Sequence, residues 1–435
     1  MGARGRAIRA CAGVAAVLLA GAACGGRIAE EAGERDRAPI DPLAVHLGAI
    51  ASLSGPDQEI GQRFLLGTQL FVDQINAAGG MRGRRVVLHV EDDRSEPAVT
   101  REKLHALAER GVRVAVGPTT SEQAYLLQLE ARTHVLDLVS PTATSSALED
   151  GSGSPTPFRV LPSDGRIAVA MSVAAAQRGC ERIHLVTEER VTFAATADIL
   201  RRRATAEGRS VDADVVLPAD ASPAALAQAA EVVVRSAEGR PSCQLALLGT
   251  RTAGPYARAF RAALSLHAVP PSSLPTLAAG LGVLDPEVTL PIPRVSPFEG
   301  WWLFAPVSPA RPSAPSLAFS SAFRTRHPGV SSDIVTAVAY DAAALAALAA
   351  ADAAGRPPEA TLRSAGRPGR VRVGADDLRG FVGHEELSYE GASGVVDVAG
   401  GTEGEVGAAE IDAIGEATER LRFSGRDLGG PPYAP

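Results

Sequence analysis

The sequence runs VHLGAIAS over residues 45–52, FLLGTQLFVDQIN over residues 64–76 and VVLHVE over residues 86–91. The first and third segments are short apolar runs, and the second has the apolar spacing of an amphipathic helix. This alternation continues to residue 139. Strands that alternate with helices form parallel sheets with helices on both faces. We therefore expect the first part of the chain to be a doubly wound α/β lobe.

A second series of strands and helices begins after a proline-rich stretch at residues 152–162. The series predicts a second parallel sheet, with strands at residues 183–187, 211–217 and 245–249. Later segments predict a strand at Trp301–Phe304, a long alanine-rich helix at 334–353 and a last helix at 409–421. The expected architecture is α/β, with two lobes connected by several crossings of the chain.

The composition limits the ligand and the partner. The chain has 435 residues, enough for two or three domains, and only 4% of them are aromatic, which disfavours a sugar site lined by ring faces. The net charge of −7 disfavours nucleic acid as a partner. Arginines such as Arg201, Arg202 and Arg203 are dispersed over expected helix faces, and we interpret them as solvent-exposed.

The first 23 residues have the features of an export signal peptide. Arg4, Arg6 and Arg9 precede an apolar run at residues 10–23. This run is too short to span a bilayer stably, as is typical of a signal peptide. The mature protein is therefore expected outside the cytoplasm.

A lipidation motif ends that apolar run. Residues 18–25 read LLAGAACG and resemble a bacterial lipobox, which makes Cys24 the expected lipidated residue. Simple cleavage after Ala22 is the alternative. Residues 24–43 are polar and are expected to form a tether, so that a membrane-anchored lipoprotein faces the periplasm or the cell exterior.

Two further cysteines, Cys180 and Cys243, each precede an expected strand. If those strands are neighbours in one parallel sheet, the two thiols meet at the same sheet edge and can form a disulfide in an oxidising compartment. Two separate buried thiols are the alternative.

Short motifs in the expected loops resemble one family. In chain order they are Ser54-Gly55-Pro56, Ile75 to Gly80, Glu91-Asp92-Asp93 with Pro97, Gly117-Pro118 with Ser121, Ser140 to Thr144, Tyr340-Asp341-Ala342 and Tyr389-Glu390-Gly391. Their order and spacing are similar to those of the leucine/isoleucine/valine-binding family, the substrate-binding proteins of branched-chain amino acid ABC transporters. The resemblance implies a type I periplasmic binding protein fold, an ABC permease as partner and no enzymatic activity.

The resemblance also implies where the lobes begin and end. Residues 44–161 and 306–378 are expected to form the first lobe, residues 162–305 and 379–421 the second, and residues 422–435 a disordered tail. The protein is expected to be a monomer.

The loops after two neighbouring strands of the first lobe are the expected ligand site, because solutes bind outside the carboxyl ends of such strands. Gly117-Pro118 end one strand, and Ser121 begins a helix whose unpaired N–H groups favour an anion. Structural alternatives are a plain N-cap for Ser121 and a turn hydroxyl for Thr144. The resemblance implies a carboxylate held by the Ser121 hydroxyl, the Thr142 main chain and the Thr144 hydroxyl, with Thr120 and Ser140 beside them.

The second lobe departs from the family pattern. Leu281 stands where the family's amino-acid binders place a carboxylate against the ligand ammonium, and loss of one partner of a buried charge pair costs about 3–5 kcal/mol. An ordinary branched-chain amino acid is therefore not expected unless Asp164, Asp285 or Glu287 substitutes. Other departures are Ile60 for an aromatic residue, Thr192-Phe193 for a Tyr-Gly pair, and Arg251, which either faces the ligand or lies on the surface. Together they favour a carboxylate or amide ligand without a free ammonium group.

No cofactor or metal is expected, since neither a phosphate-binding glycine series nor a metal-ligand spacing occurs in the sequence. Asp92 and Asp93 suit capping of the helix that begins near Pro97 better than a metal pair. We expect a receptor that closes two lobes on a small solute and presents it to the permease. The alternatives are a regulatory envelope lipoprotein that binds a protein partner and little or no solute, and an enzyme on the same fold.

Overall fold

The computed structural model describes most of the chain from residue 40 onward. The described residues are 40–133, 136–148, 158–237, 241–279, 296–307, 312–352, 358–365, 371–373, 387–396, 405–412 and 417–423. From Ala44 onward, the described residues belong to one compact unit. The expected signal peptide and Cys24 lie outside the described residues.

A five-stranded parallel sheet forms the centre of the first lobe, in the order β2-β1-β3-β4-β5. Its strands are β1 (Val45–Ala51), β2 (Val86–Asp92), β3 (Val114–Val116), β4 (Asp137–Ser140) and β5 (Phe158–Arg159). Parallel sheets are covered on both faces, and the burial agrees, since every residue of β3 is buried and β1 leaves only His46 partly exposed. The predicted doubly wound lobe is confirmed.

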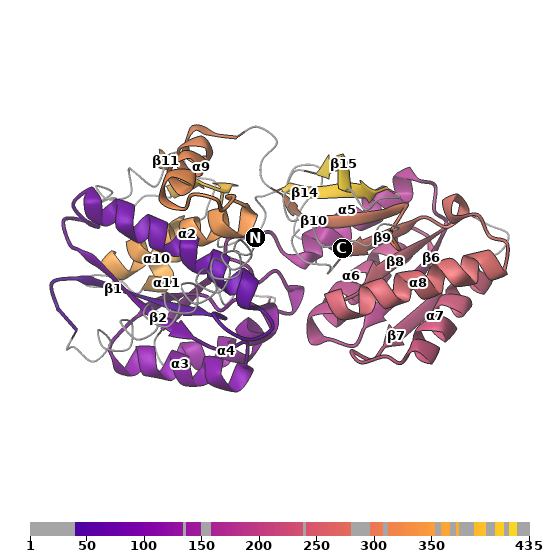
Figure 1. Cartoon of the computed structure of the whole chain (residues 1–435), viewed down its shortest axis with the longest axis horizontal. Coiled ribbons are helices and arrows are strands. Elements are labelled where there is room, and N and C mark those ends of the chain that lie inside the picture. The colour runs from indigo at the N-terminus through magenta and orange to yellow at the C-terminus, as the bar shows by residue number, and fades with distance from the viewer. Residues whose placement is uncertain are drawn as a thin grey trace, which may run out of the picture. The chain divides into compact units, whose positions relative to one another are not determined.

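Helices cover both faces of this sheet (Figure 1). They are α2 (Gln58–Ala77), α3 (Pro97–Glu109), α4 (Ser121–Thr133), α9 (Ala314–Arg326), α10 (Ile334–Asp352) and α11 (Pro358–Ala365), with a short 3-10 helix η1 (Ser146–Leu148) before β5. Helix α10 is long and apolar enough to cross a membrane, but 94% of its most apolar window is buried inside the protein. It is therefore the core helix of this lobe.

Helices α2 and α10 pack against each other at close range. A Cβ atom at Gly67 would lie only 2.1 Å from the carbonyl oxygen of Thr336, so the two backbones approach where α2 carries no side chain. Farther along the same contact, the rings of Phe71 and Tyr340 meet edge to face with their centroids 5.5 Å apart.

Seven strands form the sheet of the second lobe, in the order β15-β14-β10-β9-β8-β6-β7. They are β6 (Arg182–Glu188), β7 (Ser210–Leu217), β8 (Ser242–Leu247), β9 (Thr276–Ala279), β10 (Trp301–Val307), β14 (Glu405–Ile411) and β15 (Ala417–Phe423). The accompanying helices are α5 (Asp164–Gln177), α6 (Val191–Ala206), α7 (Pro223–Ser236), α8 (Thr250–Leu266) and the 3-10 helix η2 (Pro271–Ser273). Side chains of β8 alternate between two cores: Leu245 and Leu247 pack with α5 and α6, whereas Ala246 packs with α7 and α8.

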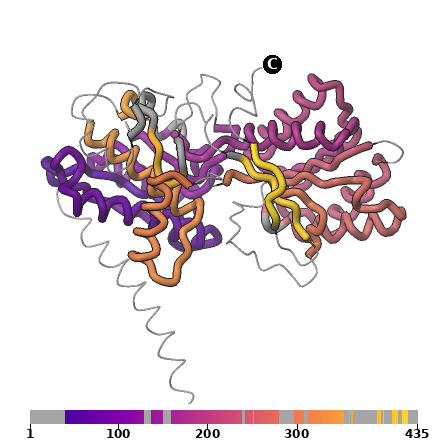
Figure 2. Tube along the Cα trace, turned by 90° about the horizontal axis from the view of Figure 1, so that it is seen from above, coloured from indigo at the N-terminus to yellow at the C-terminus, as the bar shows by residue number. Residues whose placement is uncertain are grey.

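The last two strands correct a prediction. Residues 409–421 were expected to form a helix, but β14 and β15 form an antiparallel pair, and β14 pairs with β10 (Figure 2). The free edge of β10 supplies hydrogen-bond partners for the main chain of β14, and Val406 and Ala408 alternate into the core. Tertiary pairing here overrides the helix propensity of an Ala- and Glu-rich segment. Arg422 and Phe423, expected in a disordered tail, belong to β15.

A small three-stranded sheet contains β11 (Val371–Val373), β12 (Leu387–Gly391) and β13 (Gly394–Val395). Tyr389, Ala392 and Val396 share a core with α10. Residues 387–396 therefore pack in the first lobe, which differs from the expectation that residues 379–421 belong to the second lobe.

The buried Asp341 of α10 holds this segment in place. Its carboxylate accepts hydrogen bonds from Tyr389 Oη at 2.9 Å, from Ala392 N and Ser393 N at 2.8 Å each, and from Ser393 Oγ at 2.5 Å. Two motifs that the sequence separates by 48 residues thus meet in one contact.

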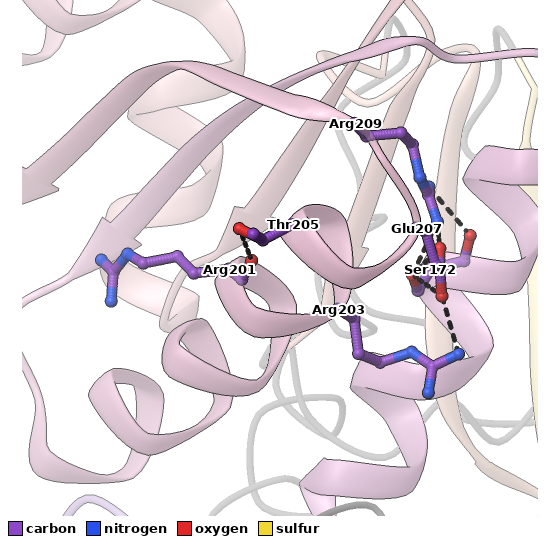
Figure 3. Close-up of polar contacts among 6 residues, drawn as sticks. All are labelled: Ser172, Arg201, Arg203, Thr205, Glu207 and Arg209. Carbon is purple, nitrogen blue, oxygen red and sulfur yellow. Dashed lines mark hydrogen bonds and ion pairs between the residues drawn. The ribbon is translucent and has the colours of Figure 1, made fainter. Parts of the chain in front are cut away.

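A cluster of charged side chains ties α5 to the end of α6 (Figure 3). The Ser172 hydroxyl donates to Glu207 at 3.0 Å and accepts from Arg209 Nη2 at 2.9 Å. Arg203 donates to the same Glu207 at 2.8 Å. Arg203 is thus partly buried and paired, whereas the neighbouring Arg202 is exposed as expected.

Cys180 and Cys243 form a disulfide, with their Cα atoms 5.7 Å apart. Cys180 lies just before β6, and Cys243 lies in β8, the neighbouring parallel strand. The alternative of two separate thiols is wrong, because the strands are neighbours and begin at the same sheet edge.

Candidate functional site

Two loops of the first lobe meet at the carboxyl edge of its sheet. One follows β3 and leads into α4, and the other follows β4. Thr120 and Gln123 form the reciprocal hydrogen bonds of a capping box, with Thr120 N donating to Gln123 Oε1 at 3.0 Å and Gln123 N donating to Thr120 Oγ1 at 3.3 Å. This local pattern fixes where α4 begins, and it places Ser121 in the first turn.

The Ser121 hydroxyl joins the two loops. Its oxygen accepts the main-chain N–H groups of Thr144 at 3.1 Å and of Ser145 at 3.2 Å. Because the oxygen acts as acceptor in both bonds, its proton is available to donate to an anion. The Thr144 hydroxyl makes no hydrogen bond to another described residue, and both side chains are partly exposed. The two hydroxyls and the amino end of α4 can together hold a carboxylate.

Three other predicted hydroxyls are engaged within the protein. Ser140 Oγ donates to the Pro118 carbonyl at 3.2 Å, Thr142 Oγ1 donates to the Thr119 carbonyl at 2.6 Å, and Thr120 Oγ1 donates to Gln123 Oε1 at 3.0 Å. Ser140 is fully buried. These bonds keep the two loops in register.

Asp92 and Asp93 hold a third loop at the same edge. Ser52 Oγ donates to Asp93 Oδ1 at 2.7 Å, and Leu53 N donates to Asp92 Oδ1 at 2.9 Å. Burial raises the pKa of Asp93. The prediction that this pair caps α3 is wrong: Glu96 precedes that helix, and no side-chain hydrogen bond caps it.

The carboxyl edge of the second sheet carries an ion pair. Glu188 ends β6 and is 1% exposed, and its Oε1 atom lies 2.5 Å from Arg190 Nε. The Glu188 Oε2 atom accepts the main-chain N–H of Gly249 at 2.8 Å. Burial by itself would raise the pKa of Glu188, but hydrogen bonds from Arg190, Thr252 and Gly249 outweigh it and lower the pKa. Glu188 is therefore a carboxylate whose charge is already balanced.

Two polar contacts connect the ligand loops of the first lobe to α6 of the second. Arg190 Nη1 lies 3.1 Å from Glu122 Oε1, next to Ser121 in α4. The hydroxyls of Ser146, in η1, and Thr196, in α6, lie 3.2 Å apart. One ion pair and one hydrogen bond thus connect the two lobes beside the candidate site.

The remaining predicted residues are distributed differently. Ile60 is 38% exposed in the first turn of α2, and Phe193 packs partly buried against the core of the second lobe. Asp164 is the first residue of α5, and its main-chain N–H donates to the Thr144 carbonyl at 2.6 Å. Arg251 lies in the first turn of α8, and its side chain is outside the described set, as is the whole of Leu281.

Sequence reasoning missed Glu122, Glu188 and Arg190. The segment Glu188 to Arg190 directly follows an expected strand, which is the position where ligand residues of this kind of sheet are found. The position of Glu188 to Arg190 after a strand is therefore the signal that could have identified them, whereas the family pattern points to Thr192-Phe193.

A separate hollow of about 600 Å³ lies at the other end of the second sheet. It is lined by residues at the beginnings of β6, β8 and β9, among them Arg178, Ser242 and Pro275. Arg178 also stacks over the Trp302 ring at 3.7 Å. The described residues include no group of three or more side chains that could hold a metal ion.

Comparison with known proteins shows the family of the chain. Residues 44–383 match a family model described as periplasmic binding protein. A Leu/Ile/Val-binding protein from Rhizobium johnstonii is 35% identical over 111 residues, which cover 26% of this chain and 30% of that protein. The chain thus spans only about a third of the length of the curated relatives it matches.

Solved structures share the fold at low sequence identity. A leucine-binding protein from Thermotoga maritima superimposes with a TM-score of 0.66 and 17% identity, covering 88% of this chain and all of that protein. A solute-binding protein of an ABC transporter from Rhodopseudomonas palustris, in complex with benzoate, gives a TM-score of 0.62 and 18% identity, covering 88% of this chain and 96% of that protein. The predicted two-lobed type I fold is confirmed, and with most of its length matched by the family model, the chain belongs to the periplasmic binding protein family.

Proposed function

We propose that this protein is an extracytoplasmic receptor that binds a small carboxylic acid between its lobes and delivers it to an ABC permease. The observation that carries the proposal is the Ser121 hydroxyl, whose oxygen accepts two N–H groups and whose proton is left to donate. The amino end of α4 adds main-chain N–H groups and a positive dipole at the same place. A carboxylate satisfies all of these donors.

The related proteins support this class of ligand. One structural neighbour is named for leucine and another holds benzoate, and both compounds carry a carboxylate. They differ in the ammonium group, which leucine has and benzoate lacks. The family resemblance implies that Leu281 stands in place of the carboxylate that faces the ligand ammonium, and we therefore propose a carboxylate or amide ligand without an ammonium group.

The proposal includes attachment to a membrane. The lipobox-like residues 18–25 make Cys24 the proposed site of lipidation, and a lipid anchor would keep the receptor close to its permease. Mass spectrometry of the protein purified from membranes tests this step. A diacylglyceryl-modified Cys24 supports it, and an unmodified amino terminus at Ala23 contradicts it.

Thermal-shift measurements test the ligand class. The purified protein should be screened against aromatic carboxylates, branched-chain keto acids, their amides and the branched-chain amino acids. A ligand at a hundred times its Kd adds about 2.7 kcal/mol to the free energy of unfolding, which raises the melting temperature measurably. We expect acids to give the shift.

Ser121→Ala is the matching variant, and Ser222→Ala is its control. Ser222 also accepts a main-chain N–H at a helix start, from Ala225 N at 3.2 Å, but it lies at the amino end of α7. We expect Ser121→Ala to abolish the ligand-induced shift and Ser222→Ala to retain it. If no compound shifts the wild-type protein, the regulatory lipoprotein becomes the better interpretation.

A further inference from the structure

Arg190 lies between two carboxylates that differ in their surroundings. It precedes α6, and its side chain is 36% exposed. Its Nε atom lies 2.5 Å from Glu188, whose side chain is 1% exposed, and its Nη1 atom lies 3.1 Å from Glu122, whose side chain is 43% exposed. The guanidinium thus has one buried partner in its own lobe and one solvent-exposed partner in the other lobe.

The bond to Glu188 is the permanent one. Glu188 is held from its other side by the main-chain N–H of Gly249, and removing Arg190 from it would leave a buried carboxylate without its cation. The hydrogen bonds to both carboxylates raise the pKa of Arg190 above its usual value even though burial lowers it. Arg190 therefore remains charged and fixed in orientation.

The bond to Glu122 is the exchangeable one. Exposed ion pairs contribute little free energy because water competes for both charges. Glu122 also follows Ser121 directly, so the Arg190 guanidinium is held at the same end of α4 where we place the carboxylate of the solute. An anion that arrives at Ser121 competes with Glu122 for Arg190.

We infer that Arg190 is the specificity-determining residue of the second lobe: its guanidinium exchanges the Glu122 carboxylate for the carboxylate of the bound solute. The inference rests on the proposed function and narrows its ligand from a carboxylate or an amide to a carboxylate. An amino acid would bring its ammonium toward a fixed guanidinium, while the nearby Glu188 carboxylate is already balanced. A keto acid or an aromatic acid brings only the negative charge.

Two substitutions at the ends of one ion pair distinguish this exchange from a simple structural contact. Arg190→Gln removes the cation, and we expect it to weaken acid binding about tenfold to a hundredfold. Glu122→Gln removes the competitor, and we expect it to strengthen acid binding by up to about fivefold. If the ion pair were only a structural contact, both variants would change the affinity for acids in the same direction, because both break the same bond.

Isothermal titration calorimetry of the full-length protein with benzoate, 4-methyl-2-oxopentanoate and leucine measures these changes. Glu189→Gln is the control, since Glu189 is exposed beside the pair and should leave all affinities unchanged. If Arg190→Gln does not fold, Arg190→Lys retains the charge, and Glu122→Gln still tests the competition. Weaker acid binding by Glu122→Gln overturns the inference.

The outcomes also separate the inference from the proposed function. If leucine binds the wild-type protein and neither acid does, the exchange at Arg190 is refuted while the solute receptor stands. If none of the three compounds binds, both fail for this ligand class. Acid binding with opposite effects of the two variants supports both.

Discussion

Replacing Asp341 by Asn tests the contact that holds residues 387–396 against the core helix. The carboxylate accepts two main-chain and two side-chain hydrogen bonds, and an amide can accept at only one of its two atoms. At least one N–H group of Ala392 or Ser393 then faces the amide nitrogen without an acceptor. Leaving a buried donor unpaired costs about 1–3 kcal/mol, so Asp341→Asn should be less stable than wild type by about that amount.

The difference between the two proteins should also depend on pH. Burial raises the pKa of Asp341 from 3.8 to about 6, against the hydrogen bonds from Ser393, Ala392 and Tyr389, which lower it. A carboxyl group with a raised pKa binds its proton more tightly in the folded protein. Its contribution to stability is therefore fully present below pH 3.8 and is lost as the pH rises through about 6.

The size of this loss follows from the two pKa values. A change from 3.8 to about 6 corresponds to about 3 kcal/mol. We expect the stability advantage of wild type over Asp341→Asn to be larger at pH 4 than at pH 7 by an amount of this order. Taking the difference between the two proteins removes the pH dependence of every other group.

Urea unfolding at pH 4, 5, 6 and 7, followed by tryptophan fluorescence and circular dichroism, gives the two free energies at each pH. Asp73→Asn is the control, because Asp73 is an exposed carboxylate on α2, paired with Arg326. Its variant should follow the wild-type pH profile. A wild-type advantage over Asp341→Asn that is constant across this range would refute the reasoning.

Two further predictions test packing and burial. Gly67→Ala should lower the free energy of unfolding by about 1–3 kcal/mol, because its Cβ would lie 2.1 Å from the Thr336 carbonyl oxygen. Gly254→Ala is the control and should raise the free energy of unfolding by about 0.5–1 kcal/mol, because its Cβ would meet nothing closer than Arg258 Nη1 at 3.7 Å. Equal effects of the two variants in urea unfolding would contradict the close contact of the helices. Burial, with a smaller effect of Arg182, lowers the pKa of His184 from 6.5 to about 4. The stability that neutral His184 provides is therefore present above pH 6.5 and is lost as the pH falls through about 4. An NMR titration of the His184 ring, assigned with His184→Gln, should show a midpoint near 4, and a midpoint near 6.5 would contradict its burial.

The sequence was sufficient for the parallel sheets because their signal is local. Each strand of the first lobe is a short apolar run beside an amphipathic helix, and this pattern needs no knowledge of the partner strand. The start of α2 was missed by six residues, since Ile60 is the single large apolar residue between Gln58 and Arg63 and one residue gives no apolar period. The sequence indicates a helix there only through apolar periodicity, and it does not show the main-chain hydrogen bonds that extend α2.

The late part of the chain was predicted poorly because its structure depends on distant partners. β14 is a strand only because β10, about a hundred residues earlier, has a free edge. Tyr389 belongs to the first lobe because Asp341, which lies 48 residues earlier, accepts its hydroxyl. Local propensity favours a helix at residues 409–421, and it contains no information on either contact.

The candidate site divides in the same way. The loops that contain Ser121 and Thr144 were predicted because they follow neighbouring strands, whose carboxyl ends meet at one edge, and the family resemblance singled out these two hydroxyls. Glu122 and Arg190 were not predicted because they lie in different lobes, so no strand spacing relates them. Such a pair becomes visible only when both lobes are folded.

If the proposed function is correct, the two lobes contribute differently to ligand selectivity. The donors of the first lobe, Ser121 and the amino end of α4, bind a carboxylate, which keto acids, aromatic acids and amino acids all share. They cannot distinguish these solutes from one another, because each presents the same group. Discrimination must therefore come from the second lobe, where Arg190 is the charged residue that contacts α4 within the described part of the chain. A family that keeps the first half-site and changes the second can thus alter its ligand class without changing how the carboxylate is held.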